Sequence, residues 1–376
     1  MVGFNKAPFL GAELDYIRDA VSRQTSGGGE YTRRCNEILE GQTAAKRVFL
    51  ANSCTAALEM SALMLDLEPG DEVICPSFTF VTSASAFALR GAKIVFVDIK
   101  DDTLNLDENL LERAITSKTK AIVLVHYAGV SCEMDTILEI AERHNLRVIE
   151  DAAQAFGSSY KGRFCGSVGD FGCLSFHETK NISCGEGGAL LVNREELVER
   201  AEIIIEKGTN RSKFFRGQVD KYTWVDLGSS YLPSDMLAAF LYPQLCESGR
   251  INGRRMEFWD NYHKSFEEFE GRGVVRRPVV PAHCEHNAHL YYLRFGCLEV
   301  RTDFISFMKQ NEISCPFHYV PLHSSPAGQK YGRVAGKMDV TDDVGDTLVR
   351  LPLFYSMDFE VQGEVIEKAV RFLRRL

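Results

Sequence analysis

The sequence predicts an α/β fold in which helices cover both faces of a mostly parallel β-sheet. Short apolar runs typical of buried strands alternate with helical patterns from residue 47 to residue 149. This order is the pattern of strand–helix–strand units, which build parallel sheets. The chain has 376 residues, of which 45% are hydrophobic, so it is long enough for one large and one smaller domain.

The first half begins with helical patterns at residues 12–21 and 31–39, and a glycine-rich loop separates them. The alternation of strands and helices follows these two helices. Strands are expected at 47–50, 72–75, 93–97, 120–125 and 147–149, and helices at 55–65, 81–89, 107–114 and 134–144.

The second half is less regular. We expect strands at 171–174 and 189–192, a helix at 195–206, and an irregular polar and aromatic stretch from Gly208 to Tyr231. A long helical pattern runs from 234 past 262 and is bent or broken near Pro243, and a last helix covers 359–373. We place a domain boundary within the long helix, which gives domains of residues 1–245 and 246–376.

Composition argues against several function classes. The net charge is −9, from 43 basic and 52 acidic residues, so nucleic acid is not an expected partner. The eleven cysteines are scattered without C-x-x-C pairs and are expected to be reduced. No metal site is expected, because the regularly spaced His283, His286 and His289 lack accompanying ligands. No apolar run approaches the roughly 20 residues of a membrane span, so we expect a cytoplasmic protein without membrane contact.

Lys180 lies in a predicted turn between two buried strands, close to Gly185, Gly187 and Gly188. Burial of a lysine costs several kcal/mol unless its pKa falls or it reacts, and a neutral lysine can attack an aldehyde. The glycines permit a tight turn and close approach to a ligand. An exposed loop lysine is the alternative for a lone residue.

The carboxylate of Asp151 is a possible partner of Lys180. Asp151 follows the expected strand at 147–149, at the edge where α/β proteins bind ligands. Pyridoxal 5'-phosphate (PLP) needs an amine for its Schiff base and a carboxylate that keeps its pyridine nitrogen protonated. Lys180 and Asp151 would supply both groups.

These segments resemble the DegT/StrS-type nucleotide-sugar aminotransferases, which are fold type I PLP-dependent transferases similar to aspartate aminotransferase. The resemblance covers nearly the whole chain and rests on residues 150–154, 175–188, 53–58 and 76–80. It implies a large PLP-binding domain, a smaller C-terminal α/β domain, and a homodimer with active sites at the interface.

The resemblance also implies roles for cofactor-binding residues. Ser53, Cys54 and Thr55 open a helix whose N–H groups suit a phosphate, although Ser53 could simply cap that helix. In the family, the serine that matches Ser175 also binds the phosphate. The residue that matches Phe80 stacks on the pyridine ring, and the residue that matches Gln154 lies near the oxygen on that ring. Ser230 replaces an asparagine that reaches the partner's phosphate in many relatives, and its shorter side chain leaves that contact open.

Substrate-binding residues follow from the same resemblance and from position. His126 ends a strand at the ligand edge, where a structural role is equally open, and His318 lies in a segment that matches the active-site mouth. Cations and polar groups that suit a sugar diphosphate are expected at Lys207, Asn210, Arg211, Arg216, Lys221 and Tyr222. For the cations, solvated surface charges are the alternative.

The implied reaction is a transamination. An amino acid, expected to be L-glutamate, donates its amino group to C4 of a nucleotide-linked 4-keto-6-deoxy sugar, expected to be dTDP-4-keto-6-deoxy-D-glucose, for a cell-surface glycan such as lipopolysaccharide or O-antigen. The similarity of residues 207–212, 216–222 and 317–319 to the family branch that acts on this sugar carries the choice. Alternatives are C3 amination, a PLP-dependent dehydratase, in which a histidine replaces the lysine, and a non-catalytic PLP-binding regulator.

Overall fold

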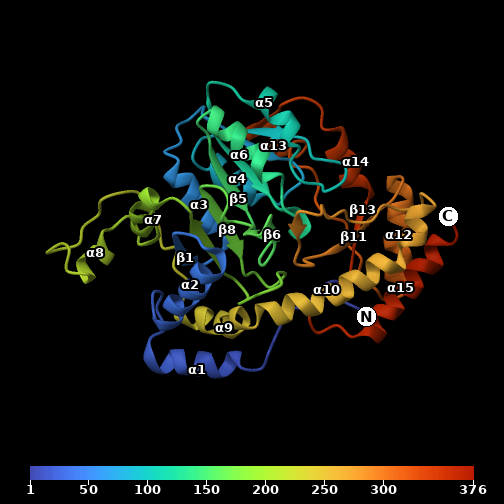
Figure 1. The fold of residues 1–376 in the computed structure, drawn as a ribbon, viewed down its shortest axis with the longest axis horizontal. Coiled ribbons are helices and arrows are strands. Elements are labelled where there is room, and N and C mark those ends of the chain that lie inside the picture. The colour runs from blue at the N-terminus through green and yellow to red at the C-terminus, as the bar shows by residue number, and fades with distance from the viewer.

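The computed structural model describes residues 1–376 and is organised around an eight-stranded sheet (Figure 1). Its strands are ordered β1-β9-β8-β5-β4-β2-β3-β12. Their bounds are β1 Arg47–Ala51, β2 Glu72–Pro76, β3 Lys93–Val97, β4 Thr119–Val125, β5 Arg147–Asp151, β8 Phe171–Ser175, β9 Gly188–Val192 and β12 Gly332–Val334. Two small sheets contain β6 Ser159–Tyr160, β7 Arg163–Phe164 and β10 Cys284–Glu285, and β11 Tyr291–Arg294 and β13 Leu348–Leu351.

In the large sheet, β9 alone runs antiparallel to its neighbours, β1 and β8. The other pairs are parallel. The start of β9 therefore lies beside the carboxyl ends of β1 and β8, with Gly188 opposite Ala51 and Ser175. This arrangement confirms the predicted fold class and brings several loops to one edge.

The helices and short 3-10 turns connect these strands. Those before residue 250 are α1 Glu13–Arg23, α2 Glu30–Thr43, α3 Cys54–Met64, α4 Thr82–Ala88, η1 Glu108–Leu110, α5 Leu111–Ala114, η2 Tyr127–Gly129, α6 Met134–Arg143, η3 Glu195–Leu197, α7 Val198–Ile205, α8 Arg211–Phe215 and α9 Asp235–Cys246. Those that follow are α10 Ser248–Ser265, α11 Glu267–Gly271, α12 Leu298–Gln310, α13 Pro326–Tyr331, α14 Asp339–Thr347 and α15 Phe359–Leu373.

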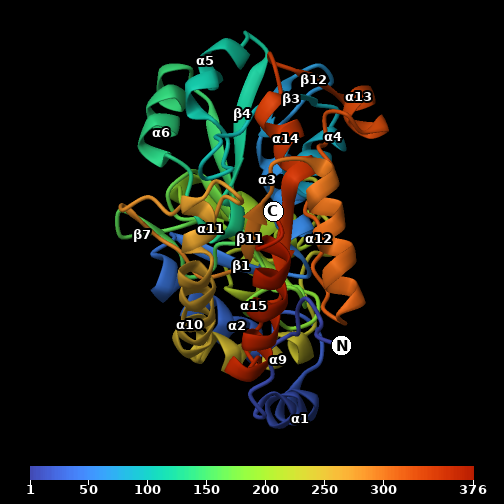
Figure 2. The ribbon, with the colours of Figure 1, turned by 90° about the vertical axis from the view of Figure 1, so that its right-hand side faces the viewer.

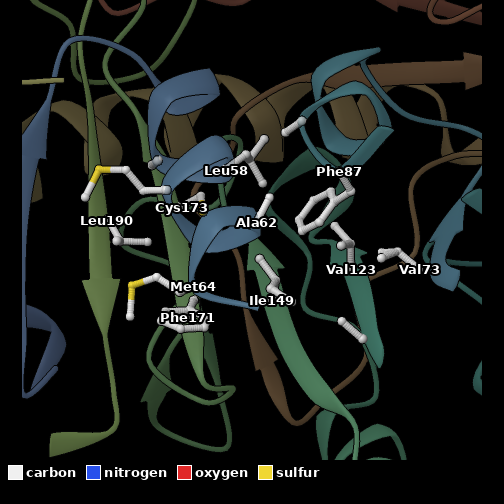
Figure 3. Packing of buried hydrophobic residues seen from close by; sticks show 14 of the residues in the cluster. Leu58, Ala62, Met64, Val73, Phe87, Val123, Ile149, Phe171, Cys173 and Leu190 are labelled. Atoms are coloured by element: carbon white, nitrogen blue, oxygen red, sulfur yellow. The ribbon is translucent and has the colours of Figure 1, made fainter. Parts of the chain in front are cut away.

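Alternation along each strand divides the core between the two faces of the sheet. In β2, Val73 and Cys75 face one cluster, whereas Ile74 faces another. Residues of α3, α4 and α7 pack on the first face, and Figure 3 shows Leu58 and Ala62 of α3 against it. Residues of α5 and α6 cover the second face at β4 and β5, and those of α2 and α9 cover it at β1 and β9.

The long helical pattern is divided, as predicted, although the division lies slightly later. Pro243 lies inside α9, which continues to Cys246, and α10 begins at Ser248. A proline lacks the N–H of a helical hydrogen bond and clashes with the preceding turn, so a helix ends or bends near it. The short helix α8 within the irregular stretch was not predicted, and Figure 1 shows it projecting from the body.

A second core lies among α10, α11, α12, α15, β11 and β13 (Figure 2). It is built from residues after 257, including Phe258, Tyr291 and Phe304. Two segments cross the predicted boundary at residue 246: Val2 forms a bridge with Ile313, and β12 pairs with β3 of the large sheet. The domain limits remain a prediction. None of the helices has both the length and the apolar composition required to cross a bilayer.

Candidate functional site

A cavity of about 660 Å³ opens at the edge of the sheet where the loops meet. Its walls come from both halves of the chain. They include Phe4, Asn5, Ser53, Cys54, Thr55, Thr79, Phe80, Asp151, Gln154, Ser175, His177, Lys180, His289, Phe317, His318, Tyr319 and Arg350. Nine of the residues predicted from the sequence to form the site are among them: Ser53, Cys54, Thr55, Phe80, Asp151, Gln154, Ser175, Lys180 and His318.

Lys180 lies in the loop between β8 and β9, as predicted, and lines this cavity. The loop is fixed by hydrogen bonds from the Lys180 N–H to the His177 carbonyl, 2.9 Å, and from the Glu178 N–H to the Gly185 carbonyl, 2.9 Å. Burial lowers the pKa of the Lys180 ammonium, and the charge of Arg350 acts in the same direction. The site therefore favours the neutral amine more than water does.

Asp151 ends β5 and is buried, with 4% of its surface exposed. The Ser83 hydroxyl donates to its Oδ2 at 2.6 Å, and the Ala153 N–H donates to its Oδ1 at 3.1 Å. Thr79 Oγ1 lies 2.8 Å from the Ser83 hydroxyl oxygen. These donors orient the carboxylate, whose oxygens can accept a hydrogen bond from a cationic ring.

The N-terminus of α3 forms another wall. The Ser53 side chain caps the helix by accepting from the Ala56 N–H at 3.0 Å. The first N–H groups of a helix, here those of Cys54 and Thr55, have no partner within it, and they attract anions. A Cβ on Gly188 would lie 2.4 Å from the Cys54 nitrogen, so only glycine lets β9 approach this close.

Gln154 and Phe80 contribute to the wall in different ways. The Gln154 amide accepts from the Ala128 N–H at 2.8 Å and donates to the Tyr319 hydroxyl at 3.1 Å, so its orientation is fixed. Phe80 is 56% exposed at the cavity, which leaves its ring free to cover a planar ligand. Ser175, the last residue of β8, is buried with 7% exposure.

The two predicted histidines occupy different surroundings. His126 has no exposed surface and does not line the cavity: its Nδ1 accepts from the Cys132 N–H at 3.1 Å, so its Nε2 donates to Glu150 at 2.8 Å. Its position supports the structural alternative. His318 lines the cavity, with Nδ1 2.8 Å from the Tyr127 hydroxyl, and burial keeps its pKa well below the ordinary value.

The predicted substrate residues between 207 and 222 do not line the cavity of their own chain. The Arg216 guanidinium forms an ion pair with Glu202 at 2.6 Å, and Asn210 accepts from the Thr223 N–H at 2.8 Å. Arg211 lies 3.9 Å from Glu206. Lys207, Lys221, Tyr222 and the predicted phosphate ligand Ser230 are exposed and also lie outside the cavity.

Several wall residues were not among the predicted site residues. His289 Nδ1 lies 3.0 Å from Asn181 Oδ1, and the Tyr319 ring stacks on that of His318 with 3.6 Å between centroids. Tyr319 has a left-handed φ of 53°, which a non-glycine residue adopts only where surrounding contacts hold it. Arg350 and Phe4 come from opposite ends of the sequence. Two of these residues lay in segments that the sequence had singled out: His289 in the regularly spaced histidines and Tyr319 in residues 317–319. Neither was assigned a role in the site.

Comparison with known proteins identifies the family. Residues 11–370 match the sequence model of the DegT/DnrJ/EryC1/StrS aminotransferase family. The chain belongs to this family. It is 35% identical to the spore coat polysaccharide biosynthesis protein SpsC of Bacillus subtilis, over 97% of this chain and 95% of that protein.

Solved structures with a similar fold support the same family assignment. The sugar aminotransferase Spr1654 of Streptococcus pneumoniae superposes with a TM-score of 0.92 at 27% identity and 100% coverage of both chains. DesV of S. venezuelae, solved in complex with a ketimine intermediate, gives a TM-score of 0.90 at 28% identity, covering 100% of this chain and 99% of its own. The predicted family, fold type, enzyme class and cofactor are confirmed: the chain is a PLP-dependent aminotransferase whose solved relatives include sugar aminotransferases.

The wall residues fit PLP. The cavity combines a lysine with a lowered pKa, an oriented carboxylate, and a helix N-terminus with small polar side chains. An aldehyde, a pyridinium and a phosphate ester need these respective groups.

Proposed function

We propose that this family member transfers an amino group from L-glutamate to C4 of dTDP-4-keto-6-deoxy-D-glucose, in the synthesis of a cell-surface glycan. The observation that carries the amino-transfer chemistry is the placement of Lys180, Asp151 and the N-terminus of α3 around one cavity. The choice of sugar rests on the resemblance of residues 207–212, 216–222 and 317–319 to the branch that acts on it. The sugar aminotransferases among the solved relatives support the substrate class.

In this proposal, Lys180 attaches PLP and afterwards serves as the base. Its Nζ, released by the donor's amine, takes the proton from the donor's α-carbon and returns it elsewhere on the reacting system. The lowered pKa of Lys180 keeps that nitrogen free to accept a proton. PLP, when bound, supplies an aldehyde that exchanges amines and a ring that accepts the electron pair from the α-carbon.

The remaining wall residues bind the cofactor and orient it. Asp151 holds the pyridine nitrogen protonated, while Ser83 and Ala153 keep its carboxylate aimed. Phe80 would cover the ring, and Gln154 would lie near the ring oxygen. The phosphate binds to the N-terminus of α3, where the ligands are Ser53, Cys54, Thr55 and Ser175.

The acceptor is tested by offering L-glutamate with dTDP- and UDP-linked 4-keto and 3-keto 6-deoxy sugars. The expected product is the dTDP-linked 4-amino-4,6-dideoxy sugar, identified by mass and NMR. A pocket built for the C6 methyl should disfavour a C6 hydroxyl by only about 10²-fold. Amination at C3, or a preference for UDP, would contradict the assignment but leave the aminotransferase intact. Absence of turnover with every pair would favour a non-catalytic role.

We further propose a homodimer in which residues 208–231 pack against the partner. This segment carries unusually exposed aromatic side chains, with Phe215 68% and Trp224 74% exposed, and it projects from the body (Figure 1). Arg211, Lys221, Tyr222 and Ser230 of this segment, together with the preceding Lys207, would then approach the partner's cavity rather than their own. Exposed apolar groups that adjoin one another mark such interfaces.

Light scattering at low protein concentration tests whether the protein is a homodimer. The wild type should have twice the mass of one chain, whereas a double variant Phe215→Asp/Trp224→Asp should dissociate and lose activity. A stable monomer with full activity would exclude a composite site.

A further inference from the structure

A second cavity, of about 570 Å³, lies at the edge of the large sheet opposite the cavity that contains Lys180. Arg147 begins β5 and lines the second cavity, whereas Asp151 ends β5 and lines the first. Four residue steps along a strand place these two residues about 13 Å apart. No residue lines both cavities. The second cavity is therefore separate from the proposed transamination site.

Three arginines from different segments meet at this second cavity. Arg147 Nη1 and Arg194 Nε lie 2.9 and 3.0 Å from the same atom, Oδ1 of Asp170. Arg163, at the start of β7, donates to the Val168 carbonyl at 3.3 Å and forms no ion pair. A guanidinium carries five N–H donors, so most of the donors in this cluster have no partner within the protein.

The acidic groups at this cavity do not balance the three cations. One is Asp170, which is 4% exposed and also accepts from the Val148 N–H at 2.8 Å. The other is Glu142, which is exposed on α6. Three positive charges against two negative charges leave one positive charge, in a protein whose net charge is −9. A bound anion would supply the missing negative charge and would accept from the free guanidinium donors.

The loop beside these arginines is fixed by buried hydrogen bonds. The Glu150 carboxylate accepts from the Val168 N–H at 2.7 Å and from the Gly169 N–H at 2.6 Å. The Asn193 amide donates to the carbonyls of Gly166 and Gly169, both at 3.0 Å. Binding to a wall that is already ordered costs less conformational entropy than binding to a loose one. The cavity is thus formed before a ligand enters.

We propose that this second cavity binds a small organic phosphate, whose phosphate contacts the three arginines and whose uncharged portion contacts α6. Guanidinium groups match phosphate oxygens through paired N–H donors. Leu138 and Ala141 of α6, together with Leu146, give the cavity an apolar part. Inorganic phosphate would leave that part uncovered, whereas a nucleoside monophosphate has both a dianion and a largely uncharged body. The inference goes beyond the proposed function and holds for any sugar acceptor.

The test is calorimetry of the PLP-loaded enzyme with thymidine monophosphate, inorganic phosphate and thymidine. The monophosphate should bind most tightly, phosphate more weakly, and thymidine not measurably. The double variant Arg163→Gln/Arg194→Gln keeps Arg147 on Asp170, and its Kd for the monophosphate should rise about 100-fold, since each charged hydrogen-bond donor contributes about tenfold or more. Circular dichroism and PLP absorbance check that the variant is folded and loaded.

Arg143→Gln is the matched control. Arg143 also lies at the end of α6, but it pairs with Glu112 at 2.6 Å and does not line the cavity. This variant should bind the monophosphate as the wild type does. Hydrogen–deuterium exchange locates the ligand, because the monophosphate should protect residues 163–170 in the wild type and not in the double variant.

Four results would overturn the inference. The first is saturable binding of neither the monophosphate nor phosphate to the wild type. The second is equal binding of the monophosphate by the wild type and the double variant. The third is exchange protection confined to residues 175–188, which would place the nucleotide in the Lys180 cavity instead. The fourth is binding of succinate as tightly as the monophosphate, which would indicate a carboxylate site rather than a phosphate site.

Discussion

Lys180→Ala should yield a folded protein that binds PLP without a covalent bond and turns over at least about 10²- to 10⁴-fold more slowly, the range that a positioned acid–base group contributes. The phosphate contacts at α3 and the hydrogen-bond acceptor at Asp151 remain in this variant, so PLP should stay bound. The visible absorption of lysine-bound PLP should disappear. Absorbance spectra and single-turnover rates with L-glutamate measure both effects.

Chemical trapping identifies the lysine directly. Borohydride reduction of the wild type followed by peptide mapping should place the label on Lys180, whereas another labelled lysine would refute the assignment. Lys161→Ala is a suitable control, since Lys161 pairs with Asp135 on the surface at 2.6 Å and is absent from the cavity wall. Its spectrum and rate should match those of the wild type.

Asp151→Asn should leave the fold intact and slow the proton-transfer step by about 10²- to 10³-fold, as the loss of one preorganised electrostatic group does. A neutral amide cannot hold the pyridine nitrogen protonated, so the ring becomes a poor electron acceptor. With glutamate deuterated at its α-carbon, the isotope effect should rise because proton transfer becomes more strongly rate-limiting.

Ser83→Ala separates charge from orientation at the same carboxylate. It removes the 2.6 Å donor to Oδ2 but keeps the negative charge of Asp151, so its effect should be markedly smaller. Turnover near wild type in Asp151→Asn would show that this carboxylate has only a structural role.

The sequence predicted well those features that local patterns encode. The strands at the centre of the sheet are short apolar runs between helical patterns, and Asp151 and Lys180 lie directly after such runs, so chain order alone placed both at one edge. The helix break near Pro243 followed from the missing N–H of proline. The family resemblance then directed attention to Ser53, Phe80 and Gln154, which local pattern alone could not separate from caps and core.

The unpredicted features depend on contacts between distant parts of the chain. Phe4 and Arg350 lie near opposite ends of the chain and meet only after β13 and the N-terminal segment pack together. His126 was interpreted from its position at a strand end, but its side chain contacts Glu150. The Glu150 carboxylate in turn accepts N–H groups from the loop at residues 166–169, which lies far along the chain from His126. The ion pair of Arg216 with Glu202 likewise requires the fold of α8 against α7.

The pairing of β12 with β3 has a consequence for how the chain can be divided. Residues Gly332–Val334 cover the outer edge of β3 by parallel pairing. A fragment that ended at residue 245 would leave that edge with unpaired N–H and C=O groups, a template for pairing between molecules and for aggregation. The C-terminal segment that contains β12 thus covers the exposed edge of β3 and prevents it from pairing with other molecules. The large and small units are therefore expected to be stable together rather than as separate fragments.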